Sequence, residues 1–468
     1  MPSAVPEPGA GQAAGAIRFP QAIGRLQRGQ LHEGIRDLRD ILRHDPAHSP
    51  SLFALGRALL VVGASRESAA ALEAYVGREP GDAEGWNLLC AARSAQGSFE
   101  GALEAVRRSL EIDASRAIAH SNLGNVLYRL ARHDEALLAY EHALALDPGN
   151  SLTRWNLGLC RLLLGDYRRG WADYESRWQQ RESPLFAPRP FFDRPWWRGE
   201  GDLQGRTVLL HAEQGLGDTI QFCRYVPLVA ERGARIVLEV PAALRSLVQR
   251  SFAHCSSVVV RGEAIPDFDL HCPLMSLPGA MGTRLESIPA RVPYLLPDPE
   301  RVAAWSAQLG PRTRPRVGIA WSGGSRPPFG GLRNVPLSKF STLADAGWEL
   351  LGLQTEVQES DRAAMNGMGG LRWLGDSIRD FDDTAAIASL CDAVVSIDTS
   401  VAHLAGAMGK AVRILLPLAP DWRWLRERGD SPWYPTARLY RQDDGADWSG
   451  AMARLVEDLR RDLAPAAA

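Results

Sequence analysis

Small residues recur with a period of 34 residues through the first third of the chain. Blocks of this length can be started at Gly15, Ser49, Ala83, Ala117 and Ser151. The eighth position of each block is Ala22, Gly56, Cys90, Gly124 and Gly158. The twentieth position is Gly34, Ser68, Ala102, Ala136 and Gly170. Two helices that cross closely need small side chains where they touch. The pattern therefore predicts a repeated pair of helices stacked into an array.

The block Ala117–Asn150 carries the pattern most fully. It places Leu123, Gly124, Ala136, Tyr140, Ala143 and Pro148 at signature positions of the tetratricopeptide repeat. Residues 15–184 thus resemble that repeat family. The resemblance implies an α-solenoid whose concave groove holds a peptide or protein segment, and a spacer or dimerisation arm is the alternative. The aromatic tail of the fifth block (Trp171, Tyr174, Trp178) is expected to dock on the region that comes after it in the chain.

Beyond a crossing rich in proline and aromatic residues, 185–205, apolar runs alternate with helical patterns. The first series of predicted strands is Thr207–Ala212, Arg235–Val240, Ser257–Val260 and Phe268–Cys272. The second series is Arg316–Trp321, Glu349–Leu353, Leu371–Leu374, Ala393–Ile397 and Ala411–Leu416. Unbroken apolar runs are typical of buried parallel strands. The two series predict two Rossmann-like lobes, 206–305 and 306–468, with ligands bound in a cleft at the carboxyl ends of the strands.

Bulk composition narrows the functional classes. A formal net charge of −2 provides no general attraction to nucleic acid or to an anionic membrane. No apolar run reaches the length of about 18 residues that a membrane span needs. The six cysteines form no CxxC pair and have no histidines at zinc spacing, which predicts buried, reduced thiols and a cytoplasmic location. Residues 1–14, rich in Pro, Gly and Ala, are expected to form a disordered tail.

The first strand of the α/β part runs into HAEQGLGDTIQF. Gly215 and Gly217 permit a tight turn, and Asp218 opens a helix predicted over 218–232. At the mouth of a cleft, such a carboxylate can take a proton from an acceptor hydroxyl. An N-capping aspartate in an ordinary turn is the alternative. Glu213 and His211 are neighbouring candidates for the same proton transfer.

The second lobe carries CDAVVSIDTSVAHLAGAMGK. The predicted strand 393–397 runs into Asp398, Thr399 and Ser400, and a helix comes next. Free N–H groups at a helix start, with two hydroxyls beside them, favour a phosphate or diphosphate. Asp398 is a candidate for sugar hydroxyls, and His403 is placed to face the same cleft. A capping box with a core histidine is the alternative.

Loops after neighbouring strands add further donor-side candidates. The loop after 316–321 reads SGGSRPPFGGLRN, in which Gly323 and Gly324 permit a turn and Arg326 and Arg333 are the charges. Arg333 is a candidate for bidentate binding of a phosphate, with a surface arginine as the alternative. Gln354 closes the strand 349–353 and is a candidate contact to a base or ribose, with an ordinary loop amide as the alternative.

Two other clusters are interpreted as structural. Asp380, Asp382 and Asp383 precede a helix and are predicted to cap it rather than to bind a metal. No DxD motif stands at the end of a strand, so we expect metal-independent chemistry. Trp422, Trp424 and Trp433 are predicted to pack between the lobes rather than to form a sugar platform.

The segments QGLGDTIQF and SIDTSVAHLAGAMG, with PDWRW and SPWYPTARLYRQ, resemble bacterial tetratricopeptide-linked glycosyltransferases. Their catalytic half is similar to lipopolysaccharide heptosyltransferases of the GT-B fold, and the resemblance covers about Ala16 to Asp462. It implies an α-solenoid followed by a two-lobed α/β region, with Asp218 as the base and Asp398, Thr399 and His403 on the donor. The fusion is also similar to O-linked N-acetylglucosamine and flagellin-modifying transferases, whose acceptors are proteins.

The sequence thus predicts transfer of a sugar from a nucleotide-activated donor to a protein hydroxyl, without a metal cofactor. Asp218 is the predicted catalytic residue. The predicted donor-binding residues are Gly215, Gly217, Arg333, Gln354, Asp398, Thr399, Ser400 and His403. A glycan or lipid acceptor is one alternative, and a non-catalytic scaffold with a vestigial transferase region is another.

Overall fold

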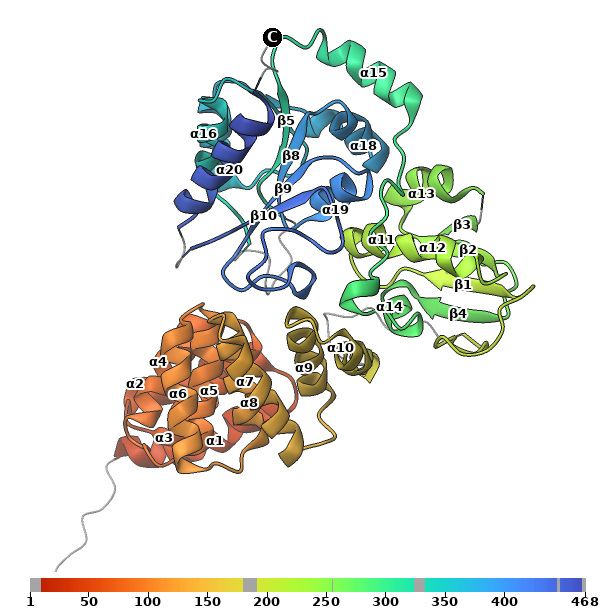
Figure 1. Cartoon of the computed structure of the whole chain (residues 1–468). Helices are drawn as coiled ribbons and strands as arrows, with labels where there is room; N and C mark the ends of the chain where they lie inside the picture. The colour runs from red at the N-terminus through yellow and green to blue at the C-terminus, as the bar shows by residue number, and fades with distance from the viewer. Residues whose placement is uncertain (1–9, 180–191, 255, 324–332, 444–446, 465–468) are drawn as a thin grey trace, which may run out of the picture. The chain divides into compact units, whose positions relative to one another are not determined.

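The computed structural model describes residues 10–179, 192–254, 256–323, 333–443 and 447–464. The chain divides into two compact units, Met1–Leu157 and Gly158–Ala468 (Figure 1). Most of the predicted tail, residues 1–9, lies outside the described residues, and the first helix begins at Ala10.

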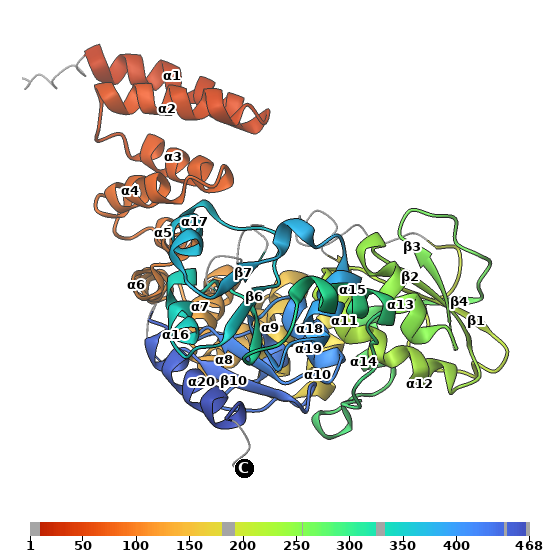
Figure 2. The ribbon, with the colours of Figure 1, turned by 90° about the horizontal axis from the view of Figure 1, so that it is seen from above.

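The first unit is an array of helical hairpins. The paired helices are α1 (Ala10–Gln27) and α2 (Leu31–His44), α3 (Ser49–Val61) and α4 (Ser65–Val76), α5 (Ala83–Ala95) and α6 (Phe99–Ile112), and α7 (Ala117–Arg129) and α8 (His133–Leu146). Figure 2 shows the pairs succeeding one another along the array. From α3 onward, the first helices of successive pairs begin at the predicted block starts, which confirms the period.

The small positions of the repeat lie where the two helices of a hairpin touch. A Cβ atom on Gly124 would lie 2.6 Å from the ring of Tyr140, so the aromatic side chain occupies the space that glycine leaves. In the α3–α4 hairpin, the hydroxyl of Ser68 donates a hydrogen bond of 2.7 Å to the carbonyl oxygen of Gly56. A larger residue at either position would push the helices apart. The prediction about small residues is confirmed.

The first sheet of the second unit is parallel. Its strands are β1 (Thr207–His211), β2 (Arg235–Val240), β3 (Ser256–Val260) and β4 (Leu270–Pro273), in the order β3-β2-β1-β4. Helices α12 (Val226–Ala230) and α13 (Arg245–Phe252) lie on one face (Figure 1). All four predicted strands of this series are present, β2 with the predicted bounds.

The second sheet is also parallel and larger. Its strands are β5 (Arg316–Ala320), β6 (Glu349–Gly352), β7 (Leu371–Trp373), β8 (Ala393–Ile397), β9 (Val412–Leu416) and β10 (Ala437–Arg441), in the order β10-β9-β8-β5-β6-β7. Helices α16 (Ser341–Ala344) and α20 (Ser449–Asp462) lie on one side, and α18 (Phe381–Ser389) and α19 (Ser400–Ala407) on the other (Figure 1). The sequence predicted every strand except β10. Every residue of β5, β8 and β9 is buried, as expected for strands covered on both faces.

The prediction of a single helix over 218–232 is wrong. It is divided into α11 (Leu216–Phe222), a 3₁₀ turn over Cys223–Tyr225, and α12. Pro227 stands in the first turn of α12, where its missing N–H is tolerated. The same proline cannot donate to the carbonyl four residues earlier, so an unbroken helix through this point is unfavourable.

The end of the fifth block docks inside the second unit, as predicted. Helix α10 (Tyr167–Tyr174) carries Trp171, whose ring meets that of Trp422 edge-on at 5.2 Å between centroids. The hydroxyl of Tyr167 accepts a hydrogen bond of 3.2 Å from Nε1 of Trp433. These side chains are buried, so the last repeat helix shares an aromatic core with the α/β region.

Candidate functional site

The start of α11 lies against the start of α19. A Cβ atom on Gly217 would lie 2.9 Å from Cδ2 of His403 and 3.5 Å from Cα of Ser400. Only a residue without a side chain permits this approach. The loops after β1 and β8 therefore face each other, and the residues singled out in the two sequence motifs come together.

Asp218 is the third residue of α11, and both of its carboxylate oxygens have partners. Oδ2 accepts a hydrogen bond of 2.8 Å from the backbone N–H of Gly215, which fixes the turn. Oδ1 binds Nη2 of Arg423. The side chain is 22% exposed, so the carboxylate is held in place yet remains accessible.

Sequence reasoning did not single out Arg423, although PDWRW was part of the resemblance. Its Nε donates to Oε1 of Gln221 at 2.6 Å, and its Nη1 donates to Oδ1 of Asp421 at 2.8 Å. Burial acts to lower the pKa of the Arg423 guanidinium, but the charges of Asp421 and Asp218 outweigh this and raise it. Arg423 is therefore a fixed cation that joins the second lobe to the first.

Asp398 lies at the end of β8, beside His403. Its Oδ1 is 3.6 Å from Nε2 of His403, whose Nδ1 lies 2.9 Å from the hydroxyl of Tyr434. Burial acts to raise the pKa of the Asp398 carboxyl, but His403, Arg333 and Arg423 outweigh this and lower it. Asp398 is thus held as an anion. His403 is 5% exposed and has a neighbour at each ring nitrogen, so its position favours orienting Asp398.

Asp421 has the opposite electrostatic environment. Burial raises the pKa of its carboxyl, and the charge of Asp398 adds to the rise, although Arg423 opposes it. Carboxyl groups whose pKa values are driven apart in one cluster can act in different protonation states. The group formed by Asp218, Asp398, His403, Asp421 and Arg423 is named the charged cluster.

The start of α19 has no side-chain cap. Thr399 is the N-cap residue, yet its side chain makes no capping hydrogen bond. Its Oγ1 instead lies 3.0 Å from Oγ of Ser396. The capping-box alternative at this position is therefore wrong. Among the described residues, no side chain caps the first N–H groups of α19, which suits an anion.

The loop after β5 contributes Arg333. A Cβ atom on Gly323 would lie 2.8 Å from Nη2 of Arg333, so the guanidinium lies against that turn. Its Nε is buried and has no hydrogen-bond partner among the described residues. Such a donor is suited to an oxyanion that approaches the loop. Gly324 and Arg326 lie outside the described residues.

Gln354 is a structural link rather than a free amide. Its Oε1 accepts hydrogen bonds from the backbone N–H groups of Trp321 and Ser322, at 2.9 and 3.1 Å. Its Nε2 donates to Oγ of Ser322 at 2.8 Å and to the carbonyl oxygen of Glu356 at 2.6 Å. Both ends of the amide are used to hold the turn after β5, so the geometry does not favour the predicted contact to a base or ribose.

Glu213 and His211 are not available as the base. Glu213 is buried and forms a two-pronged ion pair with Arg177, at 3.0 and 2.8 Å. Burial raises the pKa of the Glu213 carboxyl, and Arg177 opposes the rise. His211 is buried on strand β1, where its Nε2 lies 3.2 Å from Nδ1 of His271 on the neighbouring strand β4. The sequence could not show these partners because they lie 36 and 60 positions away.

The clusters interpreted as structural are structural. Asp380 caps α18 by accepting from the N–H groups of Asp382 and Asp383. Trp422, Trp424 and Trp433 are buried, and the carbonyl oxygen of Trp433 accepts a hydrogen bond of 2.6 Å from Arg224 of the first lobe. Within the ranges that the structure describes, no three His, Cys, Asp or Glu side chains are arranged to hold a metal ion, and no helix is long and apolar enough to cross a bilayer.

Comparison with protein families identifies the array. One model described as "Tetratricopeptide repeat" matches residues 117–150. A second model with the same description matches residues 19–83 and, overlapping them, 53–117. Residues 19–150 are tetratricopeptide repeats. The predicted repeat family is thereby confirmed, and it accounts for the 34-residue period and the small contact positions.

One of the similar proteins matches this chain well beyond the tetratricopeptide array. The chain is 26% identical to Protein FlbA of Caulobacter vibrioides over 503 residues, which covers 94% of this chain and 83% of FlbA. It is 31% identical over 134 residues to Protein O-mannosyl-transferase TMTC1 of Mus musculus, and 26% identical over 170 residues to that of Homo sapiens. These matches cover 28% and 35% of this chain, and only 14% and 19% of the TMTC1 chains.

Solved structures match about a third of the chain. A crystal structure of MamA covers 36% of this chain and 92% of its own, with 22% identity and a TM-score of 0.33. YrrB, described as a tetratricopeptide protein with an unusual peptide-binding site, covers 34% of this chain and 82% of its own, with 16% identity and a TM-score of 0.30.

Proposed function

We propose that the protein is a glycosyltransferase that moves a sugar from a nucleotide-activated donor to a hydroxyl of a protein acceptor. The observation that carries the proposal is the approach of Gly217 to Ser400 and His403, which brings a carboxylate and an uncapped helix start together. Proton removal and phosphate binding are the two tasks of such a transfer. The printed name of TMTC1, a protein O-mannosyl-transferase, is consistent with it.

The proposed division of labour follows the two lobes, 206–305 and 306–468, as in the GT-B fold. The N–H groups of Thr399 and Ser400 with Arg333 bind the donor diphosphate or monophosphate, and stabilise the charge that develops as the sugar leaves. Asp398 binds sugar hydroxyls and is oriented by His403. Asp218 takes the proton of the acceptor hydroxyl, and the first-lobe turn with Gly215 positions it. No step in this scheme needs a metal ion.

The acceptor is proposed to be a polypeptide held by the tetratricopeptide array. YrrB is described as having a peptide-binding site, and repeats of this class form concave surfaces suited to an extended segment. A heptosyltransferase-type enzyme acting on a glycan would leave the array without a substrate. A cytoplasmic location is likewise part of the proposal.

The proposal is tested with Asp218→Asn in the full chain. Donors are first found by following thermal unfolding with a panel of nucleotide sugars, and turnover is then measured on proteins that co-purify with the chain. We expect Asp218→Asn to lower kcat by about 10²–10⁴-fold with donor affinity unchanged, because only the proton transfer is lost. Asp202→Asn, an exposed turn residue just before the same lobe, is the matched control.

Each result points to a specific conclusion. If Asp218→Asn keeps full turnover, Asp218 is not the base, and that role passes to Asp398 or Asp421, the other two carboxylates of the charged cluster. If no nucleotide sugar stabilises the chain and no protein gains a sugar, the transferase proposal is wrong and the chain is a scaffold. Transfer to a glycan or lipid, but to no protein, would contradict the proposed acceptor.

A further inference from the structure

A second candidate site lies away from the charged cluster, in the same compact unit. A cavity of about 400 Å³ is lined by α10 with the 3₁₀ turn after it, by the segment 196–198, and by the residues of and around α14 (Leu277–Ala280). Its lining side chains include Arg168, Trp171, Glu175, Trp196, Arg198, Ser276 and Arg284. The volume falls in the range of small-molecule sites.

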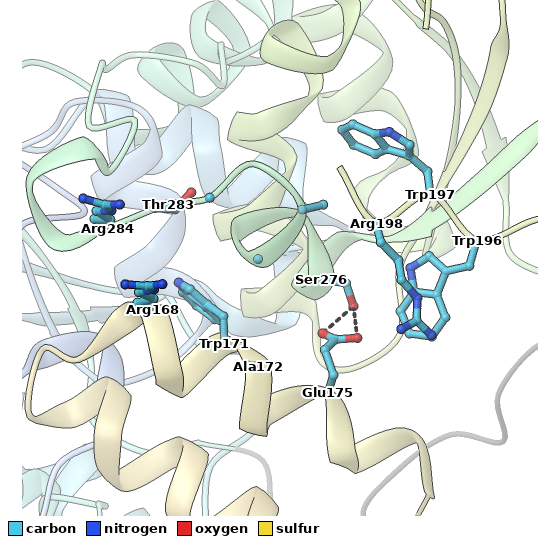
Figure 3. Close-up of a pocket in the computed structure, with 13 residues that line it drawn as sticks. Arg168, Trp171, Ala172, Glu175, Trp196, Trp197, Arg198, Ser276, Thr283 and Arg284 are labelled. Carbon is cyan, nitrogen blue, oxygen red and sulfur yellow. Dashed lines mark hydrogen bonds between the residues drawn. The ribbon is translucent and has the colours of Figure 1, made fainter. Parts of the chain in front are cut away.

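The charges around this cavity are predominantly positive. Arg168 and Arg284 lie on one side and Arg198 on the other (Figure 3). Among the described residues, none of the three has an ion-pair partner, and all three are exposed. The one carboxylate of the lining, Glu175, is already bound by Arg177 at 2.8 Å. Arg168 and Arg284, which lie on the same side of the cavity without an ion-pair partner, favour an oxyanion such as carboxylate or phosphate.

The remaining wall is suited to a sugar ring. Trp171 and Trp196 line the cavity, and the guanidinium of Arg198 lies over the ring of Trp196, 4.8 Å from its centroid. Nε1 of Trp171 is a buried donor without a partner among the described residues. Glu175 and Ser276 present oxygen atoms that are held by a hydrogen bond of 2.9 Å between them (Figure 3). Aromatic faces pack on the C–H groups of a saccharide, while polar side chains bind its hydroxyls.

We propose that this cavity binds a monosaccharide that carries an oxyanion, either a sugar phosphate or a sugar acid. The arginines bind the anionic group, and the tryptophan wall with Glu175 and Ser276 binds the ring. The site is separate from the proposed donor site, and its occupation does not depend on the chain being a transferase. Its volume of about 400 Å³ favours a small ligand over an extended acidic peptide.

The test is isothermal titration calorimetry of the full chain with four probes: glucose 6-phosphate, glucuronate, glucose and inorganic phosphate. We expect a charged sugar to bind, and glucose and inorganic phosphate to bind at least about tenfold more weakly. The first two probes distinguish a phosphate from a carboxylate. The double variant Arg168→Gln, Arg284→Gln is expected to weaken binding by about tenfold or more. Arg169→Gln, one position along α10 and outside the lining, is the matched control and should bind normally.

Several results would overturn the proposal. These are no binding of either charged sugar, unchanged binding by the double variant, or equal binding of inorganic phosphate. A short glutamate peptide is titrated as a fifth probe, and tighter binding of this peptide than of both charged sugars would show that the occupant is a peptide. Because no turnover is measured, a failed donor screen and a failed titration of this cavity are separate findings.

Discussion

The carboxylate of Asp218 and the guanidinium of Arg423 form an ion pair although they stand 205 positions apart in the chain. Arg423 is 8% exposed, and it binds Asp421 through a second nitrogen and Gln221 through the third. A single planar side chain thus sets the position of the proposed base and of a neighbouring carboxylate. The lobe that carries the proposed donor site thereby also orients the acceptor side.

The first prediction concerns this cation. Arg423→Lys keeps the charge but loses the planar fork, so it cannot hold Asp218, Asp421 and Gln221 together. We expect kcat to fall by about 10–100-fold, with a smaller change in KM, because the base is misplaced rather than the donor site lost. Steady-state kinetics with the acceptor protein measure this. Arg428→Lys, whose ion-pair partner is Asp430 on the surface, should behave as the parent chain.

The second prediction concerns the contact between the two loops. In Gly217→Ala the new methyl group would stand 2.9 Å from Cδ2 of His403, so the helix start or the imidazole must shift. Overpacking of this kind costs about 1–3 kcal/mol of stability. We expect the donor-induced rise in Tm to shrink as well, because the end of α19 that is proposed to bind phosphate moves. Gly367→Ala, with nothing within 4 Å of the added atom, should change neither quantity. An unaltered donor response in Gly217→Ala would separate Gly217 from the donor site.

A third prediction concerns pH. Burial acts to raise the pKa of the Asp383 carboxyl, but hydrogen bonds from Arg379, Trp305 and Arg301 outweigh this and hold the pKa well below its usual range. A carboxyl group with a depressed folded-state pKa stabilises the fold fully above its unfolded pKa of about 3.9. That stabilisation is lost as pH falls below this value toward the folded-state pKa.

We therefore expect Asp383→Asn to be less stable than the parent by about 1–3 kcal/mol at pH 7, because the charge-assisted hydrogen bonds that Asp383 accepts are weakened while Arg301 keeps its pair with Asp380. The difference in the free energy of unfolding between the parent and Asp383→Asn should narrow as the pH is lowered from about 4 to about 3. Urea unfolding at a series of pH values measures it, with the exposed Asp376→Asn as control. A difference that stays constant over this pH range would contradict the assigned linkage.

Local pattern was sufficient for much of the fold. The helices α3, α5 and α7 begin where the period places them, and β2 and β8 have the predicted bounds. In both cases a steric or burial requirement repeats along the chain. Strand β10 was missed because Arg438 and Arg441 interrupt its apolar pattern at the edge of the sheet. Such an edge needs no continuous apolar run.

The site was predictable only in part. The motifs around Asp218 and Thr399 stand at strand ends, and the topology of a parallel sheet brings strand ends together. Arg423 and the arginine-lined cavity depend on contacts between distant segments, about which spacing in the sequence says nothing. The same reason explains why the role of Gln354 was not predicted. The hydrogen bonds of its side-chain amide go to the turn after β5, and the sequence does not show that this turn lies next to Gln354.

The last prediction concerns Arg177, which joins the end of the fifth repeat to the loop before Asp218. Its side chain is 1% exposed and binds Glu213, which is 6% exposed. Removing one partner leaves a buried charge without compensation, so Arg177→Met should lower the free energy of unfolding by about 3–5 kcal/mol. Adding Glu213→Gln to that variant removes the stranded charge and should restore part of the loss. Urea unfolding of the two single variants and the double variant gives the coupling energy directly. If the double variant is as unstable as the sum of the single ones, the two groups do not stabilise the fold as a pair, and the rigid link between the last repeat helix and the loop of Asp218 is not electrostatic.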